Sequence, residues 1–453
     1  MRHLKISSPT ARSEVKKKRG VRVKSVYQIK EYGSFISGKE IAGYETLPEH
    51  IFRQLEDFIL NNRSKDADAL ELMGLSAKRG VGKVITARNY IGIITLNDGT
   101  AVEILPKIHS AVKDDDHGTR TKRVLIDMLK TLRESPFKSL QTAHVNIEKM
   151  DIFEIFIRMF VDEVFMIVKR GLKCSYEAVE ENTTFFKGKI LFSEQIKWNH
   201  SHRERSYVEY DAFTANRPEN KVLKATLLYL YRMTCSSKNR SDIKILLSAF
   251  SNVEASTDYK GDLAGCISDR NMKDYSTALM WCRIFLMGKS FTSFSGSEIA
   301  LALLFPMETL FESYIAALLR KKLAGSDFIV SVQDKTYHLF DEPGKKFLMK
   351  PDLVVRRKSD GAVFVLDTKW KVLDSGKVNC GIAQADMYQM FAYQKKYGAK
   401  HVTLLYPEME KVPPDSHIEF RSDDGVTVRV QFIDLFNVAS SIAKVTEQFD
   451  VAI

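Results

Sequence analysis

The chain has 453 residues, of which 44% are hydrophobic and 28% charged, and this globular composition excludes a disordered, collagen-like or coiled-coil protein. The length predicts two or three domains. Lys and Arg total 68 against 57 Asp and Glu, a formal net charge of +11, and a basic surplus of this kind favours a polyanionic partner, with nucleic acid the first candidate.

The basic surplus is concentrated at the start of the chain. Residues 1–30 contain ten Lys or Arg and one acid, Glu14, so they carry nine of the eleven net charges. Residues 1–25 are polar and lack periodicity, and we interpret them as a basic flexible arm. A solvated tail without a specific role is the alternative. The rest of the chain is close to neutral.

Cysteine spacing and hydropathy argue against a disulfide-linked, secreted or membrane protein. The five cysteines are far apart and form no Cys-x-x-Cys pair, which argues against a zinc knuckle or a disulfide framework. Reduced thiols are typical of a cytoplasmic protein. The most apolar helical stretch, residues 152–172, contains six charged residues, so we expect no membrane span. No apolar core follows Met1, and we expect no secretory signal.

The first domain is predicted to be β-rich and to span residues 26–115. Two β-branched runs, 90–96 and 100–105, flank Asn97-Asp98-Gly99, which is the pattern of a hairpin with an Asp-Gly turn. A helix is predicted over 49–60, because its apolar residues share one face. The charged stretch 110–121 is a linker candidate.

The remaining chain divides into a mainly helical region, 116–300, and an α/β region, 301–453. The first is predicted to contain helices at 124–132, 152–172, 220–233 and 275–287, with a short extended insert at 174–190. The second is predicted to contain helices at 307–323, 382–397 and 435–449, and extended runs at 328–332, 347–356, 363–370, 402–406 and 427–433. This order predicts a multidomain α+β fold whose C-terminal domain has a mixed sheet.

Two aspartates and a lysine stand out in the C-terminal region. Asp352 interrupts an apolar run, and Asp367-Thr368-Lys369 follows fifteen residues later at the end of a second run. Because Ser359-Asp360-Gly361 is a turn signal, a hairpin would place Asp352 and Asp367 on adjacent strands. Asp367 and Lys369 are two residues apart, so both side chains leave the same strand face.

Two carboxylates beside one ammonium suit the hydrolysis of a phosphodiester. The reaction needs a cation to offset the charge on the phosphate, and an activated water. Mg²⁺ prefers oxygen ligands, and a lysine beside it can orient or deprotonate the water. A surface salt bridge is the ordinary interpretation of Asp-x-Lys, but an unpaired carboxylate within an apolar strand is costly.

The neighbouring helices offer further candidates that spacing alone does not separate. Glu308 and Glu312 lie one turn apart on the same face of the predicted helix 307–323. The predicted helix 382–397 contains two Gln-x-x-x-Tyr pairs of equal spacing, Gln384 with Tyr388 and Gln389 with Tyr393.

In this order, the helix acid, Pro351-Asp352, Asp367-x-Lys369 and Gln-x-x-x-Tyr resemble the PD-(D/E)xK nuclease superfamily. More narrowly, the chain resembles the McrC family, the nuclease subunits of McrBC-type modification-dependent restriction systems. The resemblance extends to further stretches, at residues 89–92, 102–108, 187–191, 216–221, 310–312, 367–371 and 386–393.

The resemblance implies a role for each matching residue. Asp352, Asp367 and Glu312 would hold Mg²⁺, or Mn²⁺, and Lys369 would be the catalytic lysine. Gln389 and Tyr393 would orient the lysine or contact DNA. The C-terminal region, 301–453, would be a restriction-endonuclease-like domain that cleaves double-stranded DNA.

The resemblance also implies a partner, a McrB-like AAA+ GTPase ring that recognises methylcytosine-modified DNA and is bound and stimulated by the N-terminal part of this chain. No Walker loop is visible, which fits a subunit that borrows its motor. Two alternatives stay open. The chain could act mainly as a non-catalytic assembly and activator subunit of an NTPase motor, or as a nucleic-acid binder without chemistry.

Overall fold

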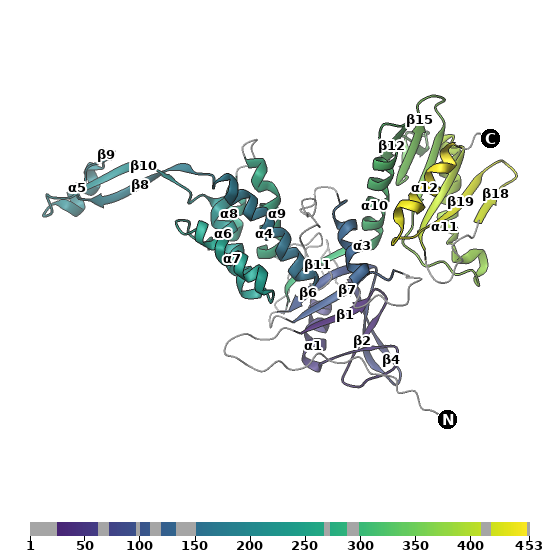
Figure 1. Cartoon of the computed structure of the whole chain (residues 1–453), viewed down its shortest axis with the longest axis horizontal. Helices are drawn as coiled ribbons and strands as arrows, with labels where there is room; N and C mark the ends of the chain where they lie inside the picture. Colours follow the sequence, from purple (N-terminus) through teal and green to yellow (C-terminus); the bar gives the residue numbers. More distant parts are fainter. Residues whose placement is uncertain are drawn as a thin grey trace.

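A computed structural model describes residues 25–61, 72–96, 100–108, 119–132, 151–266, 272–287, 299–408 and 418–450 (Figure 1). The predicted basic arm, apart from Ser25, lies outside these ranges, as do the predicted turn 97–99 and most of the predicted linker 110–121. Along the described ranges, no helix combines the length and apolar character that a membrane crossing requires.

The N-terminal unit contains two four-stranded sheets and a covering helix, α1 (Glu49–Asn61). The first sheet has the order β1-β7-β6-β11 and the second the order β3-β2-β5-β4. Their strands are β1 (Val26–Lys30), β2 (Ser34–Ser37), β3 (Glu45–Leu47), β4 (Met73–Lys78), β5 (Gly82–Ala87), β6 (Tyr90–Leu96), β7 (Ala101–Leu105) and β11 (Ile299–Pro306). The predicted helix 49–60 and the antiparallel pair β6–β7 are confirmed.

Strand β11 was not predicted, and it joins the first sheet from far along the chain. It pairs antiparallel with β6, so residues 299–306 continue the N-terminal sheet. The boundary predicted at residue 301 falls inside this strand. Gly92 permits the close approach, because a Cβ there would lie 1.9 Å from the carbonyl oxygen of Leu303.

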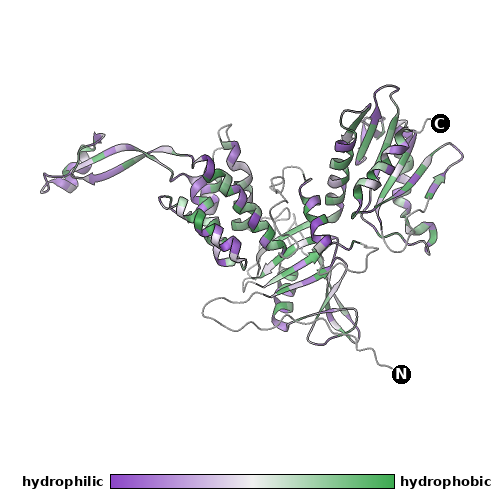
Figure 2. Cartoon of the chain, in the orientation of Figure 1, coloured by the Kyte–Doolittle hydropathy of each residue, from purple (hydrophilic) through white to green (hydrophobic). Residues whose placement is uncertain are grey.

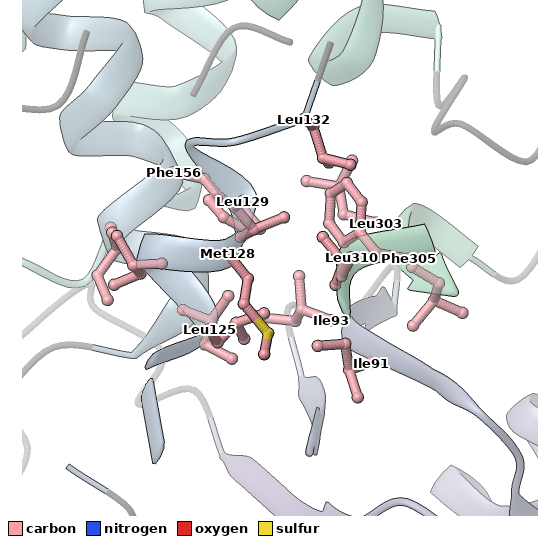
Figure 3. Packing of buried hydrophobic residues seen from close by; sticks show 14 of the residues in the cluster. Ile91, Ile93, Leu125, Met128, Leu129, Leu132, Phe156, Leu303, Phe305 and Leu310 are labelled. Carbon is pink, nitrogen blue, oxygen red and sulfur yellow. The ribbon is translucent and has the colours of Figure 1, made fainter. Parts of the chain in front are cut away.

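The middle region is a helical layer, as predicted. Its helices are α3 (Thr119–Leu129), α4 (Ile152–Arg170), α6 (Pro218–Met233), α7 (Ser237–Ala249), α8 (Tyr259–Gly265) and α9 (Lys273–Met287). Helix α3 begins before the predicted Val124, since Lys122 is buried and its Nζ lies 3.4 Å from a carboxylate oxygen of the buried Glu103. Figure 3 shows how α3 packs between Phe156 of α4 and Leu310.

A long arm projects from the helical layer (Figure 1). It consists of β8 (Ser175–Thr183), β9 (Lys189–Ile190), α5 (Phe192–Asn199) and β10 (Ser206–Thr214). Strands β8 and β10 pair along their whole length, from Ser175↔Thr214 to Ser206↔Thr183. The short extended insert predicted at 174–190 is therefore only half of a larger hairpin, and the strand that completes it was not predicted.

The C-terminal unit is a mixed six-stranded sheet with the order β12-β15-β16-β17-β19-β18. Its strands are β12 (Phe328–Val332), β15 (Leu353–Arg357), β16 (Val363–Thr368), β17 (His401–Pro407), β18 (Ile418–Arg421) and β19 (Thr427–Ile433), with a separate hairpin of β13 (His338–Phe340) and β14 (Lys346–Leu348). Its helices are α10 (Met307–Lys322), η6 (Val378–Gly381), α11 (Gln384–Tyr397) and α12 (Val438–Asp450). The predicted multidomain α+β fold with mixed sheets is confirmed.

The central strands of the six-stranded sheet, β15, β16 and β17, are buried on both faces, which explains their continuous apolar runs. On one face, Leu353, Val355 and Leu366 join the core that also contains α10 and α12. On the other face, Val354 and Val365 pack in a second core with α11. The first core continues without interruption into the N-terminal sheet, where Ile93, Leu303 and Leu310 lie together (Figure 3). Helix α10 thus ties the C-terminal unit to the rest of the chain.

Candidate active site

The β15–β16 hairpin brings the predicted carboxylates together. Leu353 pairs with Leu366 in antiparallel register, so the residues that flank this pair, Asp352 and Asp367, lie on neighbouring strands as predicted. They line a pocket of about 350 Å³ at the junction of the sheet with α10 and α11. Its lining residues are Glu308, Thr309, Glu312, Lys350, Asp352, Asp367, Thr368, Lys369, Trp370, Lys371 and Gln389.

Asp352 is fixed by the neighbouring strand. Its Oδ2 accepts a hydrogen bond from the backbone N–H of Thr368 at 2.7 Å and another from the Thr368 hydroxyl at 2.6 Å. Burial raises the pKa of Asp352, although these hydrogen bonds and the charge of Lys369 act in the opposite direction. The carboxylate is therefore held rigidly at one wall of the pocket.

Asp367 is the most buried acid of the pocket, with 2% of its surface exposed. Its Oδ2 lies 2.6 Å from Lys369 Nζ, and no other described group donates a hydrogen bond to this oxygen. Burial, and then the charge of Asp352, raise the pKa of Asp367 to about 7. Two carboxylates that disfavour each other's charge in a buried place favour a cation between them.

Lys369 is held by groups on two elements. Its Nζ donates to Gln389 Oε1 at 3.3 Å and lies 3.9 Å from Asp386 Oδ1, both on α11. Burial acts to lower the pKa of Lys369, but the charges of Asp367, Asp386 and Asp352 raise it overall. A lysine beside a cation can have a lowered pKa, but these carboxylates raise the pKa of Lys369. The side chain is therefore an ammonium.

The structure separates the two Gln-x-x-x-Tyr pairs that spacing left equal. Gln389 Nε2 donates to the hydroxyl of the buried Tyr393 at 2.8 Å, so Lys369, Gln389 and Tyr393 form one hydrogen-bonded row. Tyr388 is 66% exposed and its hydroxyl meets Gln384 at the surface. Only the Gln389 pair reaches the pocket, which matches the positions that the resemblance singled out.

Both acids of α10 line the pocket, so its outline does not choose between them. Gln333 gives Glu312 a further contact, because its Nε2 donates to Glu312 Oε1 at 3.0 Å. The backbone N–H of Gln333 donates to the carbonyl oxygen of Asp352 at 2.8 Å. Gln333 therefore connects the helix acid to the first aspartate, which favours Glu312 over Glu308.

Two charged residues of the site were not singled out from the sequence. Asp386 is 8% exposed, and its Oδ2 lies 2.8 Å from Lys371 Nζ, opposite the oxygen that faces Lys369. The signal was present, since Asp386 is three residues before Gln389 on the same helix face and Lys371 is two residues after Lys369. The site is a network of alternating charges and larger than the predicted set.

The pocket carries the ligand type that a hard divalent cation prefers, but its acids are not gathered around one point. Asp352, Asp367 and Glu312 offer carboxylate oxygens on the walls of one pocket, and oxygen ligands are those that Mg²⁺ prefers. As the described side chains are arranged, no three His, Cys, Asp or Glu come close enough together to hold a metal ion. Instead Lys369 Nζ contacts Asp367 Oδ2, the oxygen for which a cation would compete.

Comparisons with known proteins agree with the sequence motifs. No curated protein is significantly similar. Among solved structures, a chain from a half-complex of the tetradecameric assembly of Thermococcus gammatolerans McrB AAA+ hexamers with bound McrC superposes with a TM-score of 0.66 at 18% identity, covering 94% of this chain and 100% of that chain. A chain of the Thermococcus gammatolerans McrBC complex gives a TM-score of 0.45 at 18% identity, covering 66% and 88%.

The family comparison covers most of the protein. The family of the McrBC 5-methylcytosine restriction system component matches residues 85–407, a range that contains β6, the arm, α10, the β15–β16 hairpin and α11. It includes Glu312, Asp352, Asp367, Lys369 and Gln389, and the resemblance to the McrC family is confirmed. The chain belongs to the family of McrBC 5-methylcytosine restriction system components.

Proposed function

We propose that the chain is the endonuclease subunit of an McrBC-like restriction complex and hydrolyses phosphodiesters of double-stranded DNA in a Mg²⁺-dependent reaction. The single observation that carries the proposal is the pocket in which Asp352, Asp367 and Lys369 meet beside Glu312. On this proposal the C-terminal unit, 301–453, is a PD-(D/E)xK nuclease domain.

The residues of the pocket have different proposed roles in the reaction. Asp352, Asp367 and Glu312 would hold the divalent cation. When bound, this ion would offset the charge on the scissile phosphate and lower the pKa of the attacking water. Lys369 is kept as an ammonium by the acids around it, so it serves to orient water and to neutralise phosphate charge. Gln389 holds this ammonium in place, and Tyr393 holds Gln389.

Exposed residues beside the pocket fit a DNA backbone. Lys350 and Lys371 line the pocket and bring two more positive charges to it. Ammonium groups at such a position bind phosphate without reading bases, which leaves the recognition of methylcytosine to another subunit. We infer that this subunit is a McrB-like AAA+ GTPase ring, as in the assembly with which the chain shares its fold.

A second function, the assembly and stimulation of the motor, is favoured by the projecting arm. The arm carries apolar side chains that solvent reaches, among them Phe185 at 78%, Phe192 at 73% and Trp198 at 56% exposure. Tyr176 and Phe213 form a ring pair on its strands with centroids 5.2 Å apart. Clustered exposed aromatics mark a protein contact, and in Figure 2 the arm stands clear of the body. We infer that the arm contacts the AAA+ ring.

One experiment on the full chain with its AAA+ partner distinguishes the two proposed functions. Lys369→Ala should lower the cleavage of a methylcytosine-containing duplex about 10²–10⁴-fold, the scale of a lost proton-transfer or orienting group. It should leave the partner's NTP hydrolysis stimulated. Phe185→Ser with Phe186→Ser should abolish stimulation without unfolding the chain. Full cleavage by the Lys369→Ala protein would sink the nuclease proposal, and full stimulation by the arm variant would sink the arm proposal.

A further inference from the structure

A buried hydrogen bond joins the N-terminal sheet directly to the residue after the candidate catalytic lysine. Glu31 follows β1, and Trp370 follows Lys369 in the sequence. The indole Nε1–H of Trp370 donates to Glu31 Oε1 at 2.8 Å, across 339 positions of sequence. Glu31 is 2% and Trp370 4% exposed, so the bond is shielded from water.

Glu31 is fixed on the side of the N-terminal sheet. Its backbone N–H donates to the carbonyl oxygen of Leu105 at 2.9 Å, which extends the pairing of β1 with β7. Its Oε1 also accepts from the backbone N–H of Lys107 at 3.3 Å. The acceptor offered to Trp370 therefore has a set position and does not depend on a mobile side chain.

Trp370 lies between the two elements that carry the catalytic set, because it follows Lys369 and packs against the residue before Glu312. Its ring packs edge-on against the buried Phe311, with centroids 5.4 Å apart, and Phe311 immediately precedes Glu312 on α10. The adjacent Lys369 is held on its other side, where its backbone N–H donates to the carbonyl oxygen of Leu405 at 2.9 Å. The indole is thus packed beside the backbone of Lys369 and against the helix turn that carries Glu312.

A carboxylate is a costly choice for simple packing at this place. Glu31 Oε2 is buried and has no hydrogen-bond partner among the described residues. Burial raises the pKa of Glu31 to about 7, although its hydrogen bond with Trp370 acts to lower it. An apolar side chain would join the two units without this penalty. A buried carboxylate at this position is explained better if Glu31 has a function that needs a directed hydrogen bond, the one it accepts from the Trp370 indole.

Resting on the function proposed above, we propose that Glu31 is a positioning residue for nuclease catalysis. By accepting the Trp370 indole N–H, it holds Lys369 and Glu312 in register, so the N-terminal sheet completes a site whose reacting groups lie in the C-terminal unit. The outer supports of a metal or catalytic group are commonly worth 10–100-fold in activity, and we expect about tenfold or more here.

The test uses the full chain with its AAA+ partner, Mg²⁺ and a methylcytosine-containing duplex. Glu31→Ala and Trp370→Phe should each lower the single-turnover cleavage rate about tenfold or more. DNA affinity and stimulated NTP hydrolysis should not change, because the lysines proposed to meet the DNA backbone and the residues of the projecting arm keep their side chains in these variants. Glu31→Gln keeps an acceptor oxygen and should restore most of the rate. Glu45→Ala, at an exposed acid of the same unit, is the matched control and should behave as the parent.

A spectroscopic readout separates positioning from loss of structure. With ¹⁵N-labelled indoles, the signal that disappears in Trp370→Phe identifies Trp370, and Glu31→Ala should shift it and speed its hydrogen exchange. An unmoved signal, or a parallel fall of cleavage, NTPase stimulation and thermal midpoint, would overturn the positioning role. Parent-like cleavage by Glu31→Ala beside an inactive Lys369→Ala would overturn this inference alone. An active Lys369→Ala would overturn the proposed function.

Discussion

Glu154 of α4 and Asp367 of β16 are both buried acids, 7% and 2% exposed, but they are surrounded very differently. Glu154 accepts hydrogen bonds at the start of α7, from the Thr234 hydroxyl, the backbone N–H groups of Cys235 and Ser236, and the Asn239 amide. Asp367 has one ammonium neighbour, a second carboxylate beside it, and an open pocket in front.

The difference shows how a structural acid can be told from a reactive one. The donors around Glu154 belong to a helix N-terminus, where a negative charge is favourable, so this acid ties α4 to α7. The neighbours of Asp367 leave its charge poorly compensated, which destabilises the folded chain and, on the proposed function, suits the group to binding a cation. Burial alone does not distinguish the two acids. They differ in how many hydrogen-bond donors surround the carboxylate and in where those donors point.

The largest expected effect is the loss of cleavage in Asp367→Asn. Removing this carboxylate takes away a proposed cation ligand, and cleavage of a methylcytosine-containing duplex should fall by at least about 10²-fold, the scale of losing one charge-stabilising group at a reacting centre. The thermal midpoint should hold or rise by roughly 2–4 °C, the shift that about 1 kcal/mol gives a unit of this size. A variant that cleaves normally, or that loses stability, would remove the contrast with Glu154.

Glu154→Ala should have the opposite outcome. It leaves several buried donors without an acceptor, at a cost of about 1–3 kcal/mol for each unsatisfied group, so the free energy of unfolding should fall by about 3 kcal/mol in total. Cleavage per folded molecule should be unchanged. Urea unfolding measures the first quantity, with exposed Glu180→Ala as the control. A stability within about 0.5 kcal/mol of the parent would show that the network around Glu154 is not structural.

The sheet that carries Asp367 holds a second buried titratable group at its other end. His401 begins β17 beside Phe364 and faces Arg429 at 3.4 Å, with Glu419 and Lys400 as its further charged neighbours. Burial, and then the charge of Arg429, lower the pKa of His401 to about 4. The folded state therefore binds fewer protons than the unfolded state between pH 6.5 and about 4, and stability falls as the pH falls through this window.

The two buried groups thus have opposite pH slopes, since the raised pKa of Asp367 makes stability fall as the pH rises towards 7. His401→Gln should remove most of the acid-side loss, which amounts to about 3 kcal/mol or less at 1.36 kcal/mol per pKa unit. Urea unfolding at pH 7.5 and 4.5 measures the change. An equally steep acid-side loss in the variant would mean that carboxylates, not His401, set the acid limit.

Local pattern was sufficient for the parts of the site that lie close together in sequence. The apolar runs of β15 and β16 and the turn at Ser359-Asp360-Gly361 define a hairpin, and the hairpin alone brings Asp352 and Asp367 side by side. Helical spacing likewise gave the two Gln-x-x-x-Tyr pairs without separating them. The family resemblance singled out Gln389 and Tyr393, and the orientation of α11 towards the sheet agrees with it.

The sequence did not predict contacts between residues that lie far apart in the chain. Strand β11 pairs with β6 across some two hundred residues, and Glu31 meets Trp370 across 339, distances at which no periodicity carries a signal. Strand β10 was missed for a different reason. Of its nine residues only Val208 is buried and the rest are intermediate or exposed on a projecting hairpin, so they lack the apolar face that marks a strand of a core.

The smallest expected effect on the cleavage rate comes from the two Gln-x-x-x-Tyr pairs of α11. Comparing them tests whether the hydrogen bond to Lys369 matters for catalysis. Gln389→Ala removes the acceptor of the Lys369 ammonium and should lower the cleavage rate about tenfold, the lower end for an orienting partner. Gln384→Ala changes the same residue type on the same helix but at its solvent side, and should have no effect. Single-turnover cleavage with saturating AAA+ partner measures both. Equal losses would mean that the loss does not come from the hydrogen bond to Lys369, since Ala is the better helix former at both positions. The row from Lys369 to Tyr393 would then have no part in positioning the ammonium.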